Sequence, residues 1–190
     1  MSEIIYFFNQ LNSIPRIIES IAVISSVIYV ILAAKQNIWC WSFAIISTIL
    51  YIYICLTAKL FAETALQFFY LAMAGYGYSQ WNGSEKALSI TRWNITNHLF
   101  AITLGAILTL LIAFYLKTYT EAEMPIIDSF TTVFSIIATY MVTRKVLENW
   151  LYWIAIDSIS IYLYLNRDLH LTSLLFVLYT IIAIFGYFSW

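Results

Sequence analysis

The sequence predicts an all-α membrane protein: seven transmembrane helices in a 3+1+3 arrangement with two parallel three-helix repeats. Three observations support this fold class: an apolar composition, seven apolar runs of membrane-spanning length, and an internal repeat. Of the 190 residues, 63% are hydrophobic and 10% are charged, with a mean hydropathy of +0.85. A soluble domain carries roughly 25% charged residues, so most of this surface cannot face water. The net charge of −1 also excludes a nucleic-acid partner.

The seven predicted spans follow from run length. A hydrocarbon core about 30 Å thick is crossed by roughly 20 apolar residues in a helix. The runs are Ile17–Ala34, Ile38–Ala58, Leu60–Gln80, Ile95–Leu116, Ile126–Thr143, Leu147–Leu165 and Leu171–Ser189. Because backbone groups between the spans must be satisfied within helices, residues 1–190 are expected to form one integral membrane domain.

The repeat appears when the chain is shifted by 109 residues. Trp41 then falls on Trp150, and Gly77-Tyr78 falls on Gly186-Tyr187. Repeat one covers 17–81, repeat two covers 126–190, and the run 95–116 is a linker helix between them. Three spans plus one linker return the chain to its starting face, so the repeats are parallel. This plan resembles that of SWEET-type carriers, whose substrate site lies between the repeats near the bilayer midplane.

Asp157 is the most informative candidate site residue. It lies about halfway along the run 147–165, where a carboxylate costs roughly 2.5–3.5 kcal/mol unless it faces protein or water. Helical spacing puts Trp150, Trp153 and Asp157 on one stripe. A carboxylate beside aromatic rings suits a flat organic cation. The alternative is a buried Asp satisfied by a nearby Tyr or Ser hydroxyl.

Other spans contribute weaker candidates. The further substrate-binding candidates are Gln67, Trp41, Thr48, Tyr187 and Tyr78. Thr48 is the repeat counterpart of Asp157, and Tyr78 is that of Tyr187. By contrast, we expect Trp81 and Trp190 to be interfacial anchors.

Enzyme classes lack their residues in this sequence. There is no HExxH or GxSxG stretch, and Asp157 has no acidic partner in mid-span, so we expect no catalytic residue, cofactor or metal. The carboxylate of Glu148, close to Arg144 and Lys145, is expected to form an ion pair at a helix end.

Two stretches resemble the PnuC family of bacterial vitamin transporters. Residues 143–153 read TRKVLENWLYW and are similar to that family's TRKxxENWxxW hallmark. Residues 66–81 read LQFFYLAMAGYGYSQW and are similar to its LQxxFxxxxxYGWxxW stretch. The resemblance extends over all seven spans, but only these stretches are specific.

The resemblance implies a multi-pass carrier of the bacterial inner membrane. Such carriers move an unphosphorylated vitamin by facilitated diffusion, and phosphorylation in the cytoplasm then traps it. Trp150, Trp153 and Gln67 would contact the ligand. Partners would be the vitamin and the lipid bilayer, with a homo-oligomer left open. Five basic residues on the C-terminal side against four opposite favour a cytoplasmic C-terminus.

Two departures from the family pattern bear on the substrate. Nicotinamide riboside carriers typically have Asn at the positions of Asp157 and Ala74. Both changes favour thiamine, the substrate of the PnuT branch, which carries a permanent ring charge and no ribose. Nicotinamide riboside, also a ring cation, is the alternative within the family. A non-transporting membrane sensor or subunit is the alternative from another class.

Overall fold

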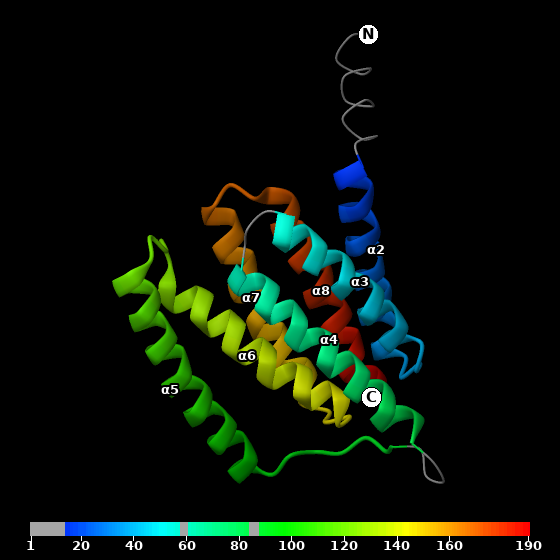
Figure 1. The fold of residues 1–190 in the computed structure, drawn as a ribbon. Coiled ribbons are helices and arrows are strands. Elements are labelled where there is room, and N and C mark those ends of the chain that lie inside the picture. Colours follow the sequence, from blue (N-terminus) through cyan, green and yellow to red (C-terminus); the bar gives the residue numbers. More distant parts are fainter. Residues whose placement is uncertain (1–13, 58–60, 84–87) are drawn as a thin grey trace. The chain divides into compact units, whose positions relative to one another are not determined.

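The computed structural model describes residues 14–57, 61–83 and 88–190. Over these residues the chain forms seven α-helices, coloured from blue to red along the sequence in Figure 1. In chain order they are α2 (Ile14–Ala34), α3 (Cys40–Thr57), α4 (Phe61–Asn82), α5 (Ile95–Tyr119), α6 (Pro125–Thr143), α7 (Asn149–Asn166) and α8 (His170–Ser189).

Each helix begins and ends within three residues of its predicted span, so the prediction of seven helices is confirmed. Within the described residues, α2, α3, α5, α6 and α8 are long and apolar enough to cross a membrane. The helices α4 and α7 are more polar because they carry side chains such as Gln67 and Asp157. Polar side chains are tolerated in a span where they face protein or a cavity rather than lipid.

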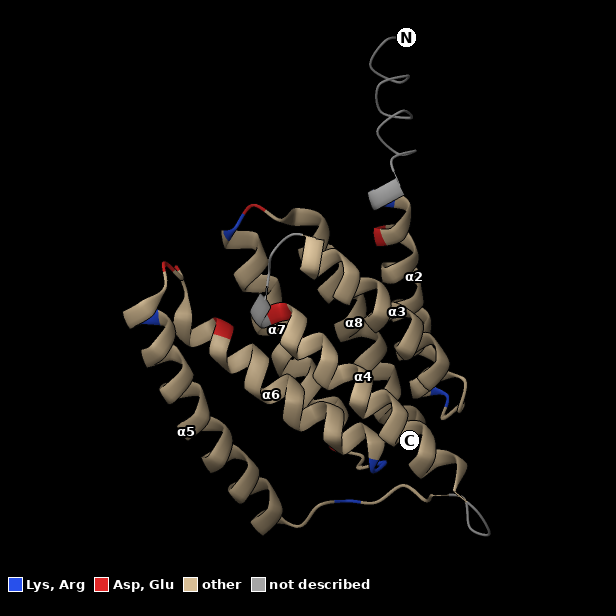
Figure 2. Ribbon diagram, viewed as in Figure 1, with Lys and Arg blue, Asp and Glu red and all other residues tan. Residues whose placement is uncertain are grey.

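The chain divides into two compact units, one up to Ser79 and one from Gln80 onward. In the first unit α2 packs along α3, and the Ser47 hydroxyl donates to the Ala22 carbonyl across that contact. In the second unit α6 packs against both α5 and α7, and α7 packs against α8. Charged residues gather near helix ends in both units, as Figure 2 shows.

An ion pair connects two helices of the second unit, α6 and α7. The guanidinium of Arg167, just after α7, donates two hydrogen bonds of 3.0 and 2.8 Å to the Asp128 carboxylate. Asp128 lies in the first turn of α6, where its charge also suits the helix dipole. The pair therefore joins the start of α6 to the end of α7.

The α2–α3 and α6–α7 turns have the same backbone hydrogen bonds. At both C-termini the chain makes the paired bonds of a Schellman motif, and the capping residues Gln36 and Lys145 have φ of 53° and 49°. The seven N–H donors of the first turn each have a counterpart 109 residues later with an equivalent acceptor. They are Lys35, Gln36, Asn37, Cys40, Trp41, Ser42 and Phe43, matched by Arg144, Lys145, Val146, Asn149, Trp150, Leu151 and Tyr152.

The helix α5 packs on α6 through small residues. Its buried positions recur every four residues, at Ala101, Gly105, Thr109 and Ala113. A Cβ added to Gly105 would lie 2.9 Å from the Phe134 ring, so the two helices approach closely there. Most large side chains of α5 are exposed and apolar, which suits contact with lipid tails.

Candidate functional site

The predicted stripe on α7 is present and mostly buried. Trp150 lies in the first turn of the helix, and Asp157 follows two turns later. Their side chains are 2% and 3% exposed, whereas Trp153 is half-buried. Trp153 packs against a small core formed by Phe134, Ala138 and Ile156 on α6 and α7. Trp153 therefore also supports the contact between α6 and α7.

The Trp150 ring packs against two residues near the C-terminus, Gly186 and Trp190. On one side it lies on the backbone of Gly186 in α8, where a Cβ would approach its ring atoms to 2.6 Å. It also meets the Trp190 ring edge-on, with centroids 5.3 Å apart. Its indole Nε1 is buried, and among the described residues it has no hydrogen-bond partner. Such an N–H is costly to bury unless something accepts from it.

Asp157 is the mid-span carboxylate that the sequence singles out. Within the described part of the chain its carboxylate accepts no hydrogen bond and forms no ion pair. The predicted alternative of a Tyr or Ser hydroxyl donating to it is therefore not realised among those residues. The hydroxyl of Ser158, next to Asp157 in the sequence, donates to the Ile154 carbonyl instead.

The turn before α7 is fastened by the segment that precedes α5. Thr91 exchanges two backbone hydrogen bonds of 2.9 Å with Lys145 and Leu147. Two residues later, the Trp93 N–H donates to the Glu148 carboxylate over 3.2 Å. The predicted ion pair of Glu148 with Arg144 or Lys145 was therefore wrong for the described residues, since its carboxylate bonds a backbone N–H instead.

A histidine–tyrosine contact continues this fastening into the helices. His98 in the first turn of α5 lies 3.0 Å from the Tyr152 hydroxyl on α7, and the two rings stack. The Trp93 ring also packs against the His98 ring, with centroids 5.6 Å apart. Segment 91–98 thereby holds the start of α7, which carries both tryptophans of the stripe.

The expectation that Trp81 is an interfacial anchor was wrong. Trp81 is 8% exposed, donates from Nε1 to the Thr143 carbonyl over 3.2 Å, and packs against the Trp190 ring. The Lys145 ammonium lies 4.6 Å from its ring centroid, a cation–π contact. Both predicted anchors are thus part of the packing around the α6–α7 turn.

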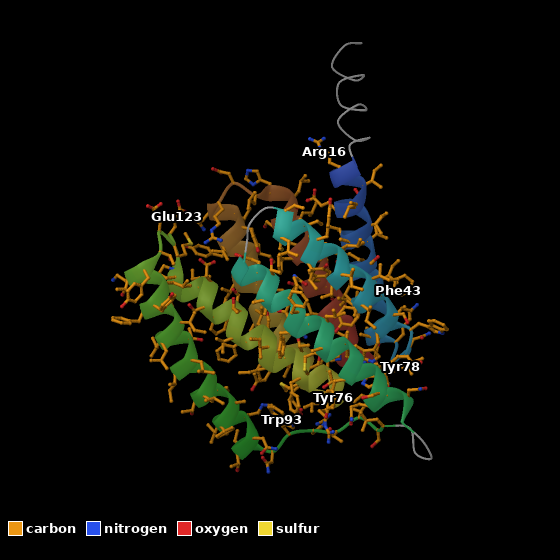
Figure 3. All side chains as sticks on the ribbon, viewed as in Figure 1. Arg16, Phe43, Tyr76, Tyr78, Trp93 and Glu123 are labelled. Atoms are coloured by element: carbon orange, nitrogen blue, oxygen red, sulfur yellow. The ribbon has the colours of Figure 1, made fainter. Side chains whose placement is uncertain are left out.

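The first unit holds the remaining candidates on α3 and α4. Trp41 is 1% exposed, contacts the Tyr29 ring at 6.0 Å, and lies against Gly77 of α4. The Thr48 hydroxyl is buried and donates to the Ala44 carbonyl of its own helix over 2.5 Å. Gln67 is half-buried, and Tyr78, labelled near the end of α4 in Figure 3, is exposed.

Some candidates are brought together and others are not. Trp41 reaches the α4 backbone next to Tyr78, and Trp150 reaches the α8 backbone next to the half-buried Tyr187. From the sequence, no role was predicted for Gly77 and Gly186. A usable signal was that the 109-residue shift places Gly77 on Gly186, just as it places Trp41 on Trp150. Within the described residues no three His, Cys, Asp or Glu side chains gather as metal ligands.

Comparison with known proteins places this fold. The family model described as nicotinamide mononucleotide transporter matches residues 16–190. The nicotinamide riboside transporter PnuC of Escherichia coli (strain K12) is 27% identical over an alignment of 202 positions, gaps included. The alignment covers 91% of this chain and 84% of that protein. The riboflavin/roseoflavin transporter RibM of Streptomyces davaonensis is 24% identical, covering 84% of this chain and 77% of that protein.

A solved structure agrees in fold. The crystal structure of the vitamin B3 transporter PnuC superimposes with a TM-score of 0.75 and 22% identity, covering 99% of this chain and 84% of that chain. Apolar helices of spanning length, together with the match to a transporter family over residues 16–190, define the class as a multi-pass membrane transporter, not an enzyme. The chain belongs to the PnuC family of vitamin transporters.

Proposed function

We propose that this chain carries nicotinamide riboside, or a vitamin with a similar ring cation, across the bacterial inner membrane by facilitated diffusion. Phosphorylation in the cytoplasm would trap the vitamin. Relatives named as nicotinamide riboside transporters support this substrate. The sequence placed thiamine first, but the reported relatives are named for nicotinamide riboside and riboflavin, and they favour the alternative.

The observation that carries the proposal is the buried Asp157 carboxylate. A charge at this depth of a span is costly, and here it has no protein donor among the described residues. A permanently charged ring in the site would neutralise it. Nicotinamide riboside carries a pyridinium charge and thiamine a thiazolium charge, so both satisfy Asp157.

Thiamine is the second candidate because of two specific residues. Asp157 gives a full negative charge rather than an amide, and the buried Ala74 offers no side-chain donor for ribose hydroxyls. A carrier that reads a ribose needs hydrogen-bond partners for it, since unpaired polar groups weaken binding. Competition between the two vitamins therefore shows which of them the carrier prefers.

Aromatic residues complete the proposed recognition. Trp153 would stack on the ring cation, and the unpartnered Trp150 Nε1 would donate to a ligand acceptor. Tyr187 in the second unit and Gln67, Trp41, Thr48 and Tyr78 in the first unit are the remaining proposed contacts.

We also propose the 3+1+3 plan, with α2–α4 and α6–α8 as two copies of one repeat and α5 as the linker. The identical hydrogen-bond pattern of the two turns supports it, as do the equivalent positive φ angles at Gln36 and Lys145. We place the C-terminus in the cytoplasm. Of the basic residues on which that orientation depends, Lys59 and Lys86 lie outside the described residues.

Flux into liposomes tests the function. Purified protein in liposomes should let labelled nicotinamide riboside reach the outside concentration and stop there. Enclosing a nicotinamide riboside kinase with ATP should raise the internal label well above that level, because the phosphorylated product cannot return. Protein-free liposomes are the control.

Three results would change the proposal. Uphill accumulation driven by a proton or sodium gradient would reject facilitated diffusion. Flux of labelled thiamine that nicotinamide riboside does not inhibit would make thiamine the substrate. Tight binding of either vitamin without any flux would favour the membrane sensor.

A further inference from the structure

Two glycines lie where two buried tryptophans need a bare helix backbone. A Cβ on Gly186 would approach Cδ2 and Cε2 of Trp150, the centre of the indole, to 2.6 Å. A Cβ on Gly77 would overlap the six-membered ring of Trp41 in the same way. Gly75, on the same helix as Gly77, meets nothing within 4 Å. The close approach is therefore specific to the glycine in each unit that faces the tryptophan.

Neither tryptophan ring has room to move aside. Trp150 and Trp41 are 2% and 1% exposed. Trp150 is also bounded by the edge of Trp190, and Trp41 by the tilted ring of Tyr29 at 6.0 Å. A well-packed interior absorbs an added methyl group only by forcing side chains off their rotamers or shifting backbone. Each ring is thus confined by a glycine backbone and an aromatic neighbour.

We infer that Gly186 and Gly77 are positioning residues, which set the planes of Trp150 and Trp41 and thereby the affinity of the carrier for its vitamin. This inference rests on the proposed function, in which these tryptophans contact the ligand. The glycines touch the rings and not the vitamin. The direction of the Trp150 N–H depends on how its ring lies on α8, so a tilt of the ring changes what the N–H can reach.

The test uses alanine at each glycine in the full-length protein. Gly186→Ala should weaken nicotinamide riboside binding about tenfold, which is 1.4 kcal/mol. Gly77→Ala should weaken it in the same direction, because its Cβ also meets ring atoms. Gly75→Ala is the matched control on α4, and it should leave affinity unchanged and not lower the melting temperature, since Ala favours helix more than Gly. Calorimetry on purified protein measures the affinities, and thiamine is titrated in parallel.

A second control separates positioning from general destabilisation. Arg167→Gln removes the ion pair with Asp128 that joins α6 to α7 and so should lower the melting temperature. It should leave the affinity of the folded protein unchanged, because neither residue is a proposed ligand contact. If Arg167→Gln weakens binding as much as Gly186→Ala does, the effect of Gly186→Ala is not specific to Trp150, and the inference is wrong.

A spectroscopic signal reports the ring directly. In protein labelled with 5-fluorotryptophan, the ¹⁹F resonance of Trp150 is assigned by its absence in Trp150→Phe. Gly186→Ala should shift that resonance, whereas Gly75→Ala should not. An unshifted Trp150 resonance in folded Gly186→Ala protein would overturn the inference.

A size exchange covers the case in which Gly186→Ala does not fold. Trp150→Ala removes the ring atoms that the new methyl group would meet, so adding Gly186→Ala to Trp150→Ala should cost little further stability. A double variant that still fails to fold would show that the methyl group clashes elsewhere, against the inference.

Failure of the inference is distinguishable from failure of the proposed function. If Trp150→Ala loses binding but Gly186→Ala binds both vitamins as the parent does, the positioning role is wrong and the site stands. If Trp150→Ala and Gly186→Ala both bind as the parent does, Trp150 is not in the site and the proposed recognition fails as well.

Discussion

The α2–α3 turn and the α6–α7 turn share their backbone geometry but differ in what surrounds them. Both carry the same hydrogen bonds and a non-glycine residue at positive φ. In the first turn Trp39 is 65% exposed, whereas its counterpart in the second turn, Glu148, is half-buried and accepts from Trp93. The local sequence therefore specifies the turn in both places, and in the second unit the segment before α5 adds hydrogen bonds to the α6–α7 turn.

The helices that follow the turns differ in charge. On α3 the Thr48 hydroxyl is satisfied by its own helix, while on α7 the equivalent Asp157 carboxylate has no donor among the described residues. The glycine–tryptophan contact, by contrast, occurs in both units. The two units therefore share the contacts that pack their helices. They differ at Asp157, the residue that we propose neutralises the charge of the ligand.

The largest expected effect tests whether the two tryptophans are equivalent in packing. Truncating a fully buried large side chain costs about 3–5 kcal/mol. We expect Trp41→Ala and Trp150→Ala each to lower the free energy of unfolding by this amount, because both are almost completely buried. Chemical unfolding in detergent measures it. A loss at Trp150 several times that at Trp41 would break the comparison.

A smaller effect tests the hydrogen bond from Trp93 to Glu148 at the α6–α7 turn. Glu148→Leu leaves the Trp93 N–H without its acceptor and should lower the free energy of unfolding by about 1–3 kcal/mol. Glu148→Gln keeps an acceptor oxygen and should lose less. The matched control is Trp39→Gln at the exposed counterpart, expected within about 0.5 kcal/mol of the parent. Equal losses from Leu and Gln at position 148 would show that the hydrogen bond does not stabilise the turn.

The smallest effect compares Gln36 and Lys145, the residues at positive φ in the α2–α3 and α6–α7 turns. Holding a non-glycine residue at positive φ costs the folded state roughly 1–2 kcal/mol. Glycine avoids this cost, but its greater freedom in the unfolded chain offsets roughly 0.5–1 kcal/mol of the gain. Gln36→Gly should therefore relieve backbone strain worth about 0.5–1 kcal/mol, less the contribution of the interaction that Gln36 makes. Lys145→Gly relieves the same backbone cost but loses the cation–π contact with Trp81, so its net effect should be near zero. Thermal unfolding of both variants, side by side, measures the difference.

The helices were predictable because the bilayer sets both their length and their composition. The mid-span position of Asp157 likewise predicted a buried carboxylate, which the structure confirms at 3% exposure. The positive φ at Gln36 and Lys145 was not predictable from residue type, since neither is the glycine that this conformation favours.

Contacts between distant segments account for the errors. The partner of Glu148 is a backbone N–H 55 residues earlier, so nearby basic residues misled the prediction. Trp81 was expected at the membrane interface because of its place at the end of a span, but Thr143 and Lys145 hold it in the interior. The choice between thiamine and nicotinamide riboside did not follow from Asp157, since both vitamins are ring cations.

The central claim, that Asp157 neutralises a ring cation, is tested most directly by binding to Asp157→Asn protein. This change removes the charge while nearly keeping the shape, and Ser158→Ala, at the exposed neighbour of Asp157 on α7, is the control. Asp157→Asn should weaken nicotinamide riboside and thiamine about ten- to a hundredfold, with much less effect on a neutral nicotinamide or pyrimidine fragment, because charge-assisted contacts are the strong ones. Ser158→Ala should change affinity little, since that hydroxyl donates within its own helix. Unchanged affinity for both charged vitamins in well-folded Asp157→Asn protein would contradict the claim.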